Sequence, residues 1–280
     1  MDDDPSSYVF GRHVDDRERL RYQFGLLRED LNAWFDRALQ LGGLPTAPDR
    51  AAWSVLDLGC GEGQLTREIA RRYPKAQVLG MDINAAAIEA AAIEAASAAE
   101  TNARFVVHDV RQPIADVASG FDVAVLWLVL LYLPDKPAAL ANVAAALRPG
   151  GVVLVGTIPD DAVRLDHPAA SEIHERGYEM VRRLGLTGFA PKLEPWLREA
   201  GFDNVRTVEL RYPAGGATCS GQRWLKYALM TFAVGRGAVV DLCRLMTAAD
   251  YDRNVECIVR ESPLDLSGEV RYLVTLARRT

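Results

Sequence analysis

The chain reads Val-Leu-Asp-Leu-Gly-Cys-Gly-Glu-Gly over residues 55–63. The apolar residues within 53–58 predict a buried strand, and a helix over residues 64–72 is expected to follow at once. Between them stand three glycines at alternate positions, which permit positive φ and close approach of the backbone to a ligand. Because the first N–H groups of a helix have no partner inside it, this order predicts a loop that binds a nucleotide-like anion. The alternative is an ordinary tight turn between strand and helix.

The glycine spacing separates two kinds of cofactor loop. A dinucleotide loop has the order Gly-x-Gly-x-x-Gly, which would place glycine or alanine where this chain has Gln64. A dehydrogenase is therefore the weakest interpretation. The observed order, Asp-x-Gly-x-Gly-x-Gly over residues 57–63, resembles the cofactor loop of class I S-adenosylmethionine-dependent methyltransferases. This resemblance implies cofactor contacts from Asp57, Gly59, Cys60, Gly61 and Gly63.

A second strand over residues 77–81 ends at Asp82-Ile83-Asn84. An acid at the tip of this strand, about 20 residues beyond the glycines, can accept hydrogen bonds from both hydroxyls of a ribose. We therefore expect Asp82 to bind the ribose and Ile83 to lie against the adenine ring. The alternative is that Asp82 caps the alanine-rich helix over residues 85–99, although Asn84 can also fill that role.

The next two strands extend the resemblance. The strand over residues 104–107 leads to Asp109 and Val110, which match the family's acid on the adenine amino group and its neighbour on the ring. The strand over residues 121–127 ends at Trp127, a predicted wall of the pocket, and the stretch Leu-Arg-Pro-Gly-Gly over residues 147–151 is expected to turn into a fifth strand, 152–155. Such turns are frequent in these methyltransferases.

The predicted fold is α/β, with a Rossmann-like seven-stranded sheet of order 3-2-1-4-5-7-6. Its sixth and seventh strands are expected at residues 205–212 and 270–277, and the last strand is antiparallel. The predicted domains are an N-terminal helical arm at 1–50, a methyltransferase core at 51–213 and 262–280, and a helical lid insert at 214–261.

The two appendages are expected to select the substrate. Residues 14–41 form an amphipathic helix, and the arm is similar to that of bacterial small-molecule methyltransferases, which implies cofactor contacts from Tyr8 and Gln23. The insert predicts helices at 221–234 and 237–246, separated by a break at the glycines of 235–237, and a third helix after a capping box at Thr247. We expect the insert to cover the active site; the alternative is an interface in a homodimer.

Composition narrows the substrate and the compartment. The net charge of −6 disfavours a nucleic-acid substrate, which calls for a basic face. The longest apolar run, 123–133, is shorter than the roughly 20 residues of a membrane-spanning helix, so no membrane partner is expected. The four cysteines lack metal-ligand spacing, so no metal is expected, and the N-terminus lacks the features of a signal peptide. The prediction is a soluble, cytoplasmic protein with a small-molecule substrate.

Methyl transfer from a sulfonium depends mainly on alignment of the reacting atoms. An alcohol acceptor benefits from a general base, and the candidates are His167 and His174, which are seven residues apart. We expect His108, next to the adenine-side acid, to be structural. The leading hypothesis is methylation of O, N or C in a small molecule, within bacterial secondary metabolism. Proteins of this fold also use the cofactor for cyclisation or decarboxylation, which is the main alternative. A non-enzymatic regulator is less favoured, because scaffolding requires no cofactor acids.

Overall fold

The computed structural model describes residues 14–47, 52–114, 120–261 and 264–280. The chain divides into two compact units. The core unit comprises Arg28–Thr157, Pro191–Val208 and Val274–Thr280, and the second unit comprises Met1–Leu27, Ile158–Ala190 and Glu209–Leu273. The segment from 158 to 190 thus clusters with the predicted insert, together with the first part of the predicted arm.

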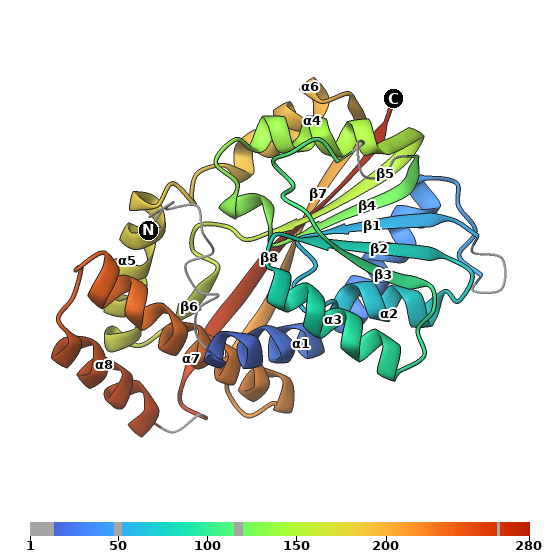
Figure 1. The fold of residues 1–280 in the computed structure, drawn as a ribbon. Coiled ribbons are helices and arrows are strands. Elements are labelled where there is room, and N and C mark those ends of the chain that lie inside the picture. Colours follow the sequence, from blue (N-terminus) through green and yellow to red (C-terminus); the bar gives the residue numbers. More distant parts are fainter. Residues whose placement is uncertain (1–13, 48–51, 115–119, 262–263) are drawn as a thin grey trace. The chain divides into compact units, whose positions relative to one another are not determined.

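The core unit is built on a sheet with strand order β3-β2-β1-β4-β5-β8, in which β7 also pairs with β8 (Figure 1). The first five strands are β1 (Ser54–Leu58), β2 (Gln77–Asp82), β3 (Ala103–Val107), β4 (Phe121–Trp127) and β5 (Leu147–Thr157). The last two, β7 (Phe202–Gly215) and β8 (Ser267–Arg279), continue into the second unit. The predicted strand order is confirmed.

The pairing of β1 through β5 is parallel throughout. The chain leaves β1 for β2 and β3 on one side and returns to β4 on the other, so the strand order reverses at β1. Ligands of open α/β sheets bind at the carboxyl ends of the strands beside such a reversal. The residues that follow Leu58, Asp82, Val107 and Trp127 therefore meet at one edge.

Helices cover both faces of this sheet. In Figure 1, α4 (Lys136–Ala146) and α6 (Leu193–Glu199) lie on one face, and α2 (Gln64–Arg72) and α3 (Ala85–Ser97) lie on the other. The central strands are buried on both sides, as Val55, Leu56 and Leu126 show with no exposed surface. Strands that are covered on both faces have continuous apolar sequences, so these strands could be predicted from the sequence.

The predicted arm helix is confirmed as α1 (Val14–Leu41). In its C-terminal half, Phe35 packs against Trp53 and Tyr73, with ring centroids 5.7 and 5.9 Å away. Asp36 pairs with Arg72 on α2, and the Arg72 guanidinium also donates to the carbonyl of Asn32 at 3.1 Å. These contacts fasten this half of α1 to the core unit.

The turn predicted over residues 147–151 lies inside a longer strand, because β5 begins at Leu147 and not at Val152. Phe121 pairs with Leu147, whereas Val123 pairs with Val152, so the register shifts between these pairs. Between these two pairs β5 has more residues than β4, which forms a bulge in β5. Within this bulge Gly150 has φ +77°. The Pro149–Gly150 pair therefore lies in a bulge within β5, and the strand begins before it.

The second unit contains a short strand that the sequence did not predict. This strand, β6 (Val163–Leu165), pairs antiparallel with β8, with Val163 opposite Val270. It leads into α5 (Pro168–Arg183), which packs against α8 (Ala248–Arg260). The Thr247 cap is confirmed, since its hydroxyl accepts the Asp250 N–H at 3.1 Å.

The predicted helix break at residues 235–237 is wrong. Helix α7 runs unbroken from Cys219 to Gly237 and continues into a single π-helical turn, η4 (Ala238–Leu242). Gly235 is buried within α7, and a Cβ there would lie 3.9 Å from the Tyr251 hydroxyl. Tertiary packing thus outweighs the modest helix penalty of glycine, which is about 1 kcal/mol.

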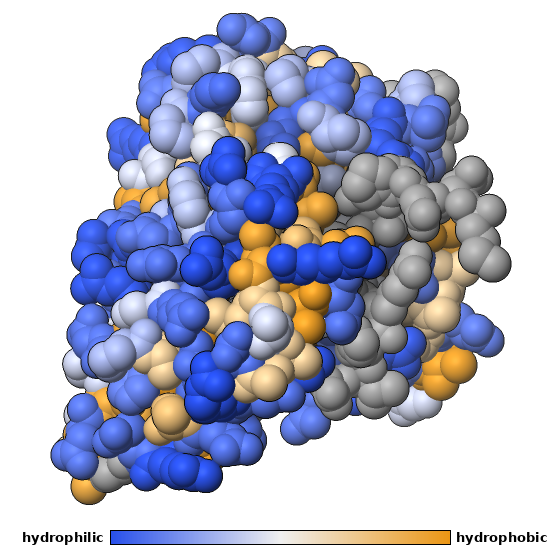
Figure 2. Space-filling model, turned by 90° about the vertical axis from the view of Figure 1, so that its left-hand side faces the viewer, coloured by the Kyte–Doolittle hydropathy of each residue, from blue (hydrophilic) through white to orange (hydrophobic). Residues whose placement is uncertain are grey.

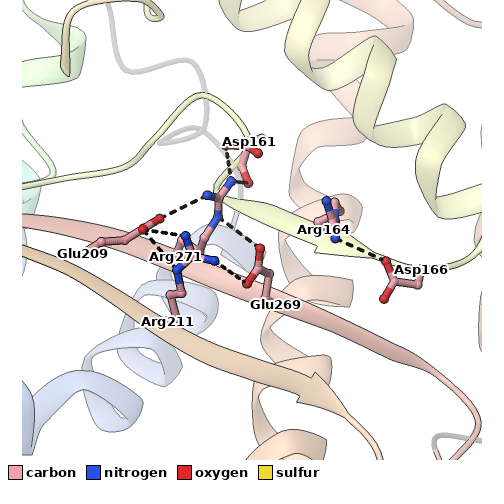
Figure 3. A network of polar contacts seen from close by, with 7 residues as sticks. All are labelled: Asp161, Arg164, Asp166, Glu209, Arg211, Glu269 and Arg271. Carbon is pink, nitrogen blue, oxygen red and sulfur yellow. Dashed lines mark hydrogen bonds and ion pairs between the residues drawn. The ribbon is translucent and has the colours of Figure 1, made fainter. Parts of the chain in front are cut away.

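One arginine joins three segments of the second unit (Figure 3). The Arg271 guanidinium on β8 pairs with Asp161 before β6, with Glu209 on β7 at 3.1 Å and with Glu269 at 3.4 Å. Its side chain is 12% exposed, so loss of a single acid would leave a nearly buried charge less well compensated. This network explains how β6 is held beside a strand that is far away in sequence.

The face shown in Figure 2 is mostly hydrophilic, with an apolar area near its centre and smaller ones toward its edges. Of the helices that the structure describes, none combines the length and apolarity needed to cross a bilayer.

Candidate functional site

The glycine loop has the conformation that its sequence predicts. Gly59, Gly61 and Gly63 have φ values of +66°, +55° and +75°. A Cβ on Gly59 would lie 2.2 Å from Cγ2 of Val129, and one on Gly63 would lie 2.6 Å from the Phe105 ring. A Cβ on Gly61 would meet no atom within 4 Å. Packing therefore requires the outer two glycines, while Gly61 leaves its backbone open to a ligand.

Asp82 links the end of β2 to this loop. One carboxylate oxygen accepts the Gly61 N–H at 2.9 Å, and the other accepts the Asn84 N–H at 2.8 Å. The cap of α3 is Asn84, whose side chain accepts from the N–H groups of Ala86 and Ala87. Asp82 is thus not the cap of α3, and its remaining lone pairs stay open to the hydroxyls of a ligand.

Two apolar side chains are exposed beside Asp82. Ile83 is 62% exposed and Val107, at the end of β3, is 51% exposed. Large exposed aliphatic groups next to an open backbone suit a flat apolar ring system. Val110, by contrast, is 7% exposed. Sequence analysis did not single out Val107, although its position at a strand end is the same as that of Asp82.

Asp109 lies beyond β3 and is engaged by Arg111. The Nε atom of Arg111 donates to both carboxylate oxygens, at 3.0 and 2.9 Å. Partial burial would raise the pKa of Asp109, but hydrogen bonds and charge from Arg111 outweigh it and lower the pKa. Asp109 is therefore a permanently ionised acceptor near neutral pH.

Two residues of the loop motif lie beneath it. Asp57 is 2% exposed, and its carboxylate accepts a hydrogen bond from the Thr66 hydroxyl at 2.5 Å. Burial raises the pKa of Asp57 to about 7, and the charge of Asp82 adds to the effect. Burial also raises the pKa of the Cys60 thiol. Both residues are placed to support the loop from below, and cofactor contact by either one remains a prediction.

Trp127 ends β4 and is half-buried. Its ring covers Gly156 on β5, where a Cβ would lie 2.0 Å from the indole. The next residue, Leu128, has φ +58°, which is a strained conformation for a side chain with a Cβ. Its N–H donates to the Gly156 carbonyl at 2.9 Å. Backbone strain of this kind is concentrated at functional sites.

The remaining predicted cofactor contacts are Tyr8 and Gln23. Tyr8 lies outside the described residues. Gln23 is 4% exposed, and its amide donates to the hydroxyls of Tyr227 at 2.6 Å and Tyr272 at 2.9 Å. Its predicted cofactor contact is untested.

Both candidate bases lie at α5. His167 is its N-cap, with Nδ1 accepting the Ala169 N–H at 3.2 Å. His174 is seven residues further along, and burial lowers its pKa despite the opposing charge of Asp161. Their catalytic role stays a prediction.

Residues 49–182 match a family model described as a methyltransferase domain. The resemblance to S-adenosylmethionine-dependent methyltransferases is confirmed over this segment, which is slightly less than half of the chain. The trans-aconitate 2-methyltransferase of Deinococcus radiodurans is 38% identical over 167 residues, which are 58% of this chain and 61% of that protein. A malonyl-[acyl-carrier protein] O-methyltransferase of Halalkalibacterium halodurans is 27% identical over 48% of this chain and 46% of its own. The matched regions thus span less than two thirds of the length of these curated relatives.

Solved structures share the fold of this chain. A crystal structure described as a putative sarcosine dimethylglycine methyltransferase from Galdieria sulphuraria superposes with a TM-score of 0.56 at 16% identity, covering 89% of this chain and 85% of that one. The [4+2]-cyclase SpnF superposes with a TM-score of 0.53 at 19% identity, covering 89% and 81%. At these identities the likeness concerns the fold alone.

The residues at this edge fit S-adenosylmethionine, the cofactor that the resemblance implies. Gly61 leaves open space where a side chain would stand, Asp82 offers a carboxylate, and Ile83 and Val107 offer exposed apolar surface. A nucleoside with two ribose hydroxyls and a flat ring requires this combination of donors, acceptors and apolar surface.

Replacement of Gly59 by alanine is expected to destabilise the fold more than the same change at Gly61. Both changes place a Cβ in the left-handed region, at about 1–2 kcal/mol each. Gly59→Ala adds a clash with Val129, so chemical denaturation should show the larger loss of unfolding free energy for this variant. Val129→Ala in the Gly59→Ala background should restore part of the loss, and absence of any recovery would contradict the assigned clash.

Asp57 predicts a specific dependence of stability on pH. Its pKa is raised from 3.8 to about 7, so between these values only the folded state holds the proton. Folded stability must therefore fall as pH rises through this window, by roughly 4 kcal/mol, and change little outside it. Asp57→Asn cannot ionise and should lose this decline in denaturation measured across the window. The control is Asp265→Asn at an exposed position. Parallel pH profiles for Asp57→Asn and the parent would disprove the assignment.

Proposed function

We propose that the chain transfers a methyl group from S-adenosylmethionine to a small-molecule acceptor. The observation that carries this proposal is the hydrogen bond from the Gly61 N–H to the Asp82 carboxylate. This bond holds an open backbone and a ribose-type acceptor side by side, with exposed Ile83 beside them. The family match over residues 49–182 supports the same cofactor.

The chain's own contribution is to bind and orient. When bound, S-adenosylmethionine supplies a methyl group on a sulfonium, which is already a good leaving group. In this proposal Asp82 holds the ribose hydroxyls, and Ile83 and Val107 lie along the adenine ring. Asp109 accepts from the amino group of the ring, and Trp127 forms a wall near the strand ends. Such orientation can account for about 7–11 kcal/mol of barrier reduction.

We propose a carboxylate as the acceptor group. The similar proteins named above include a trans-aconitate 2-methyltransferase and a malonyl-[acyl-carrier protein] O-methyltransferase. A carboxylic acid has a pKa of about 4, so it is ionised at neutral pH and needs no general base. The engagement of His167, one of the two candidate bases, as a helix cap agrees with this. A role in bacterial secondary metabolism, a cytoplasmic location and a homodimer remain predictions from the sequence.

Asp82→Ala is expected to weaken the binding of S-adenosylhomocysteine, the demethylated product, by roughly 10- to 100-fold, since hydrogen bonds to a charged acceptor are lost. Asp82→Asn keeps one acceptor oxygen and should lie between the parent and the alanine variant. Isothermal titration calorimetry measures all three.

The matched control is Asn84→Ala, which removes the α3 cap and leaves the Asp82 carboxylate in place. This variant should lose about 1 kcal/mol of stability and bind the product normally. Equal losses of affinity in both alanine variants would show that only the local fold matters, and a parent protein that binds no product would overturn the proposed function.

The acceptor class is tested by incubating the protein and S-adenosylmethionine with a panel of di- and tricarboxylic acids, phenols and primary amines. We expect a mass gain of one methylene unit on a carboxylic acid, sensitive to alkaline ester hydrolysis. Methylation confined to phenols or amines would contradict the carboxylate proposal. A product of unchanged mass, or one lighter by carbon dioxide, formed only with cofactor present, would support the non-methylating alternative.

A further inference from the structure

Asn142 clamps the segment that follows Asp109. Its side-chain amide nitrogen donates to three consecutive carbonyls: Val110 at 3.3 Å, Arg111 at 3.2 Å and Gln112 at 3.2 Å. An amide nitrogen carries two hydrogens, so the three carbonyls share them. One side chain thereby restrains three successive peptide groups that belong to no helix or strand.

The clamp stands on a well-anchored helix. Asn142 lies on α4, where the Asp135 side chain caps the helix by accepting the Ala138 N–H at 3.0 Å. The neighbouring Leu140 and Val143 are 0% and 1% exposed, so α4 is packed into the core unit beside Asn142. A donor on such a helix can position a loop, because its own location is set by core packing.

The clamped segment is what holds Asp109 in place. The Arg111 N–H donates to the Asp109 carboxylate at 2.9 Å, and the Gln112 N–H donates to the Asp109 carbonyl at 2.8 Å. The carbonyls of these same two residues accept from Asn142. On the other side, the His108 N–H donates to the Asp82 carbonyl at 3.0 Å. Asp109 lies beyond the last paired residue of β3, so these bonds replace a strand partner.

We propose that Asn142 is a positioning residue that sets the selectivity of the site for the adenine base by holding Asp109. This inference rests on the proposed function. An ionised carboxylate accepts a hydrogen bond from a ring amino group and repels a carbonyl at the same ring position. That discrimination depends on where the carboxylate stands, because hydrogen bonds weaken steeply with distance and angle. Removing the clamp lets the segment shift and reduces the preference for the amino group.

The chain offers a matched control at Asn102. Its side-chain amide nitrogen also donates to three carbonyls, those of Ala70, Tyr73 and Ala76, at 3.0–3.1 Å. These carbonyls lie between the last turn of α2 and the start of β2, away from the Asp109 segment. Asn102→Ala therefore removes the same type of clamp from a different part of the core unit.

The experiment measures the affinities of two ligands by isothermal titration calorimetry. One is S-adenosylhomocysteine, and the other is its inosine analogue, in which the ring amino group is a carbonyl. The parent should prefer the adenosine form. In Asn142→Ala and Asn142→Asp the adenosine form should bind roughly 10-fold more weakly, with little change for the inosine form. Asn142→Ser, which keeps one donor, should retain part of the preference and serves if the other variants do not fold.

Asn102→Ala should lower the thermal midpoint and leave the ratio of the two affinities unchanged. In an Asp109→Ala background, Asn142→Ala should no longer alter the ratio, because its effect acts through that carboxylate. An unchanged ratio in all folded Asn142 variants would overturn the inference, as would an equal change in Asn102→Ala. A parent protein that binds neither ligand would instead refute the proposed function, so the two failures are distinguishable.

Discussion

The Gly61 N–H donates to the Asp82 carboxylate, and the arrangement of the candidate site depends on this bond. It joins the loop after β1 to the end of β2, two segments that the parallel pairing already places side by side. The bond orients the carboxylate and leaves its other lone pairs open, while Gly61 keeps its own surface clear. The neighbouring groups, Ile83, Val107 and Asp109, lie at or just beyond the ends of β2 and β3 and so share the same edge.

Steric constraints hold this edge in shape from beneath. Val129 occupies the space that a Cβ on Gly59 would need, and Phe105 does the same at Gly63. Asp57 is buried under the loop with Thr66 as its hydrogen-bond partner, so the motif places one acid inside and another, Asp82, at the surface. The same edge includes the end of β4, where Leu128 has a strained backbone conformation. The Trp127 ring lies there against Gly156 of β5. Packing therefore holds the positive-φ residues of this edge in place, so the site is preorganised.

Sequence patterns predicted the elements of the core unit because each reflects a local cause. Strands buried on both faces give apolar runs, glycines mark positive φ, and Asn84 and Thr247 mark helix starts. The patterns failed where distant contacts outweigh local preference. Helix α7 continues through Gly235 because that residue is buried in packing, and β6 exists because it pairs with β8 and Asp161 meets Arg271.

The sequence patterns predicted the resemblance to methyltransferases, the strand order, and the positions of Asp82 and Ile83 at the candidate edge. These features depend on short-range geometry and on spacing. Only the tertiary structure shows that Asp57 is buried under the loop whereas Asp82 lies at the surface, because burial depends on how the segments pack and not on the motif. Folding alone also brought Asn142 to the carbonyls of residues 110–112, about thirty positions away. A hydrogen bond across that separation leaves no periodic trace in the sequence, because it depends on how α4 packs on the sheet.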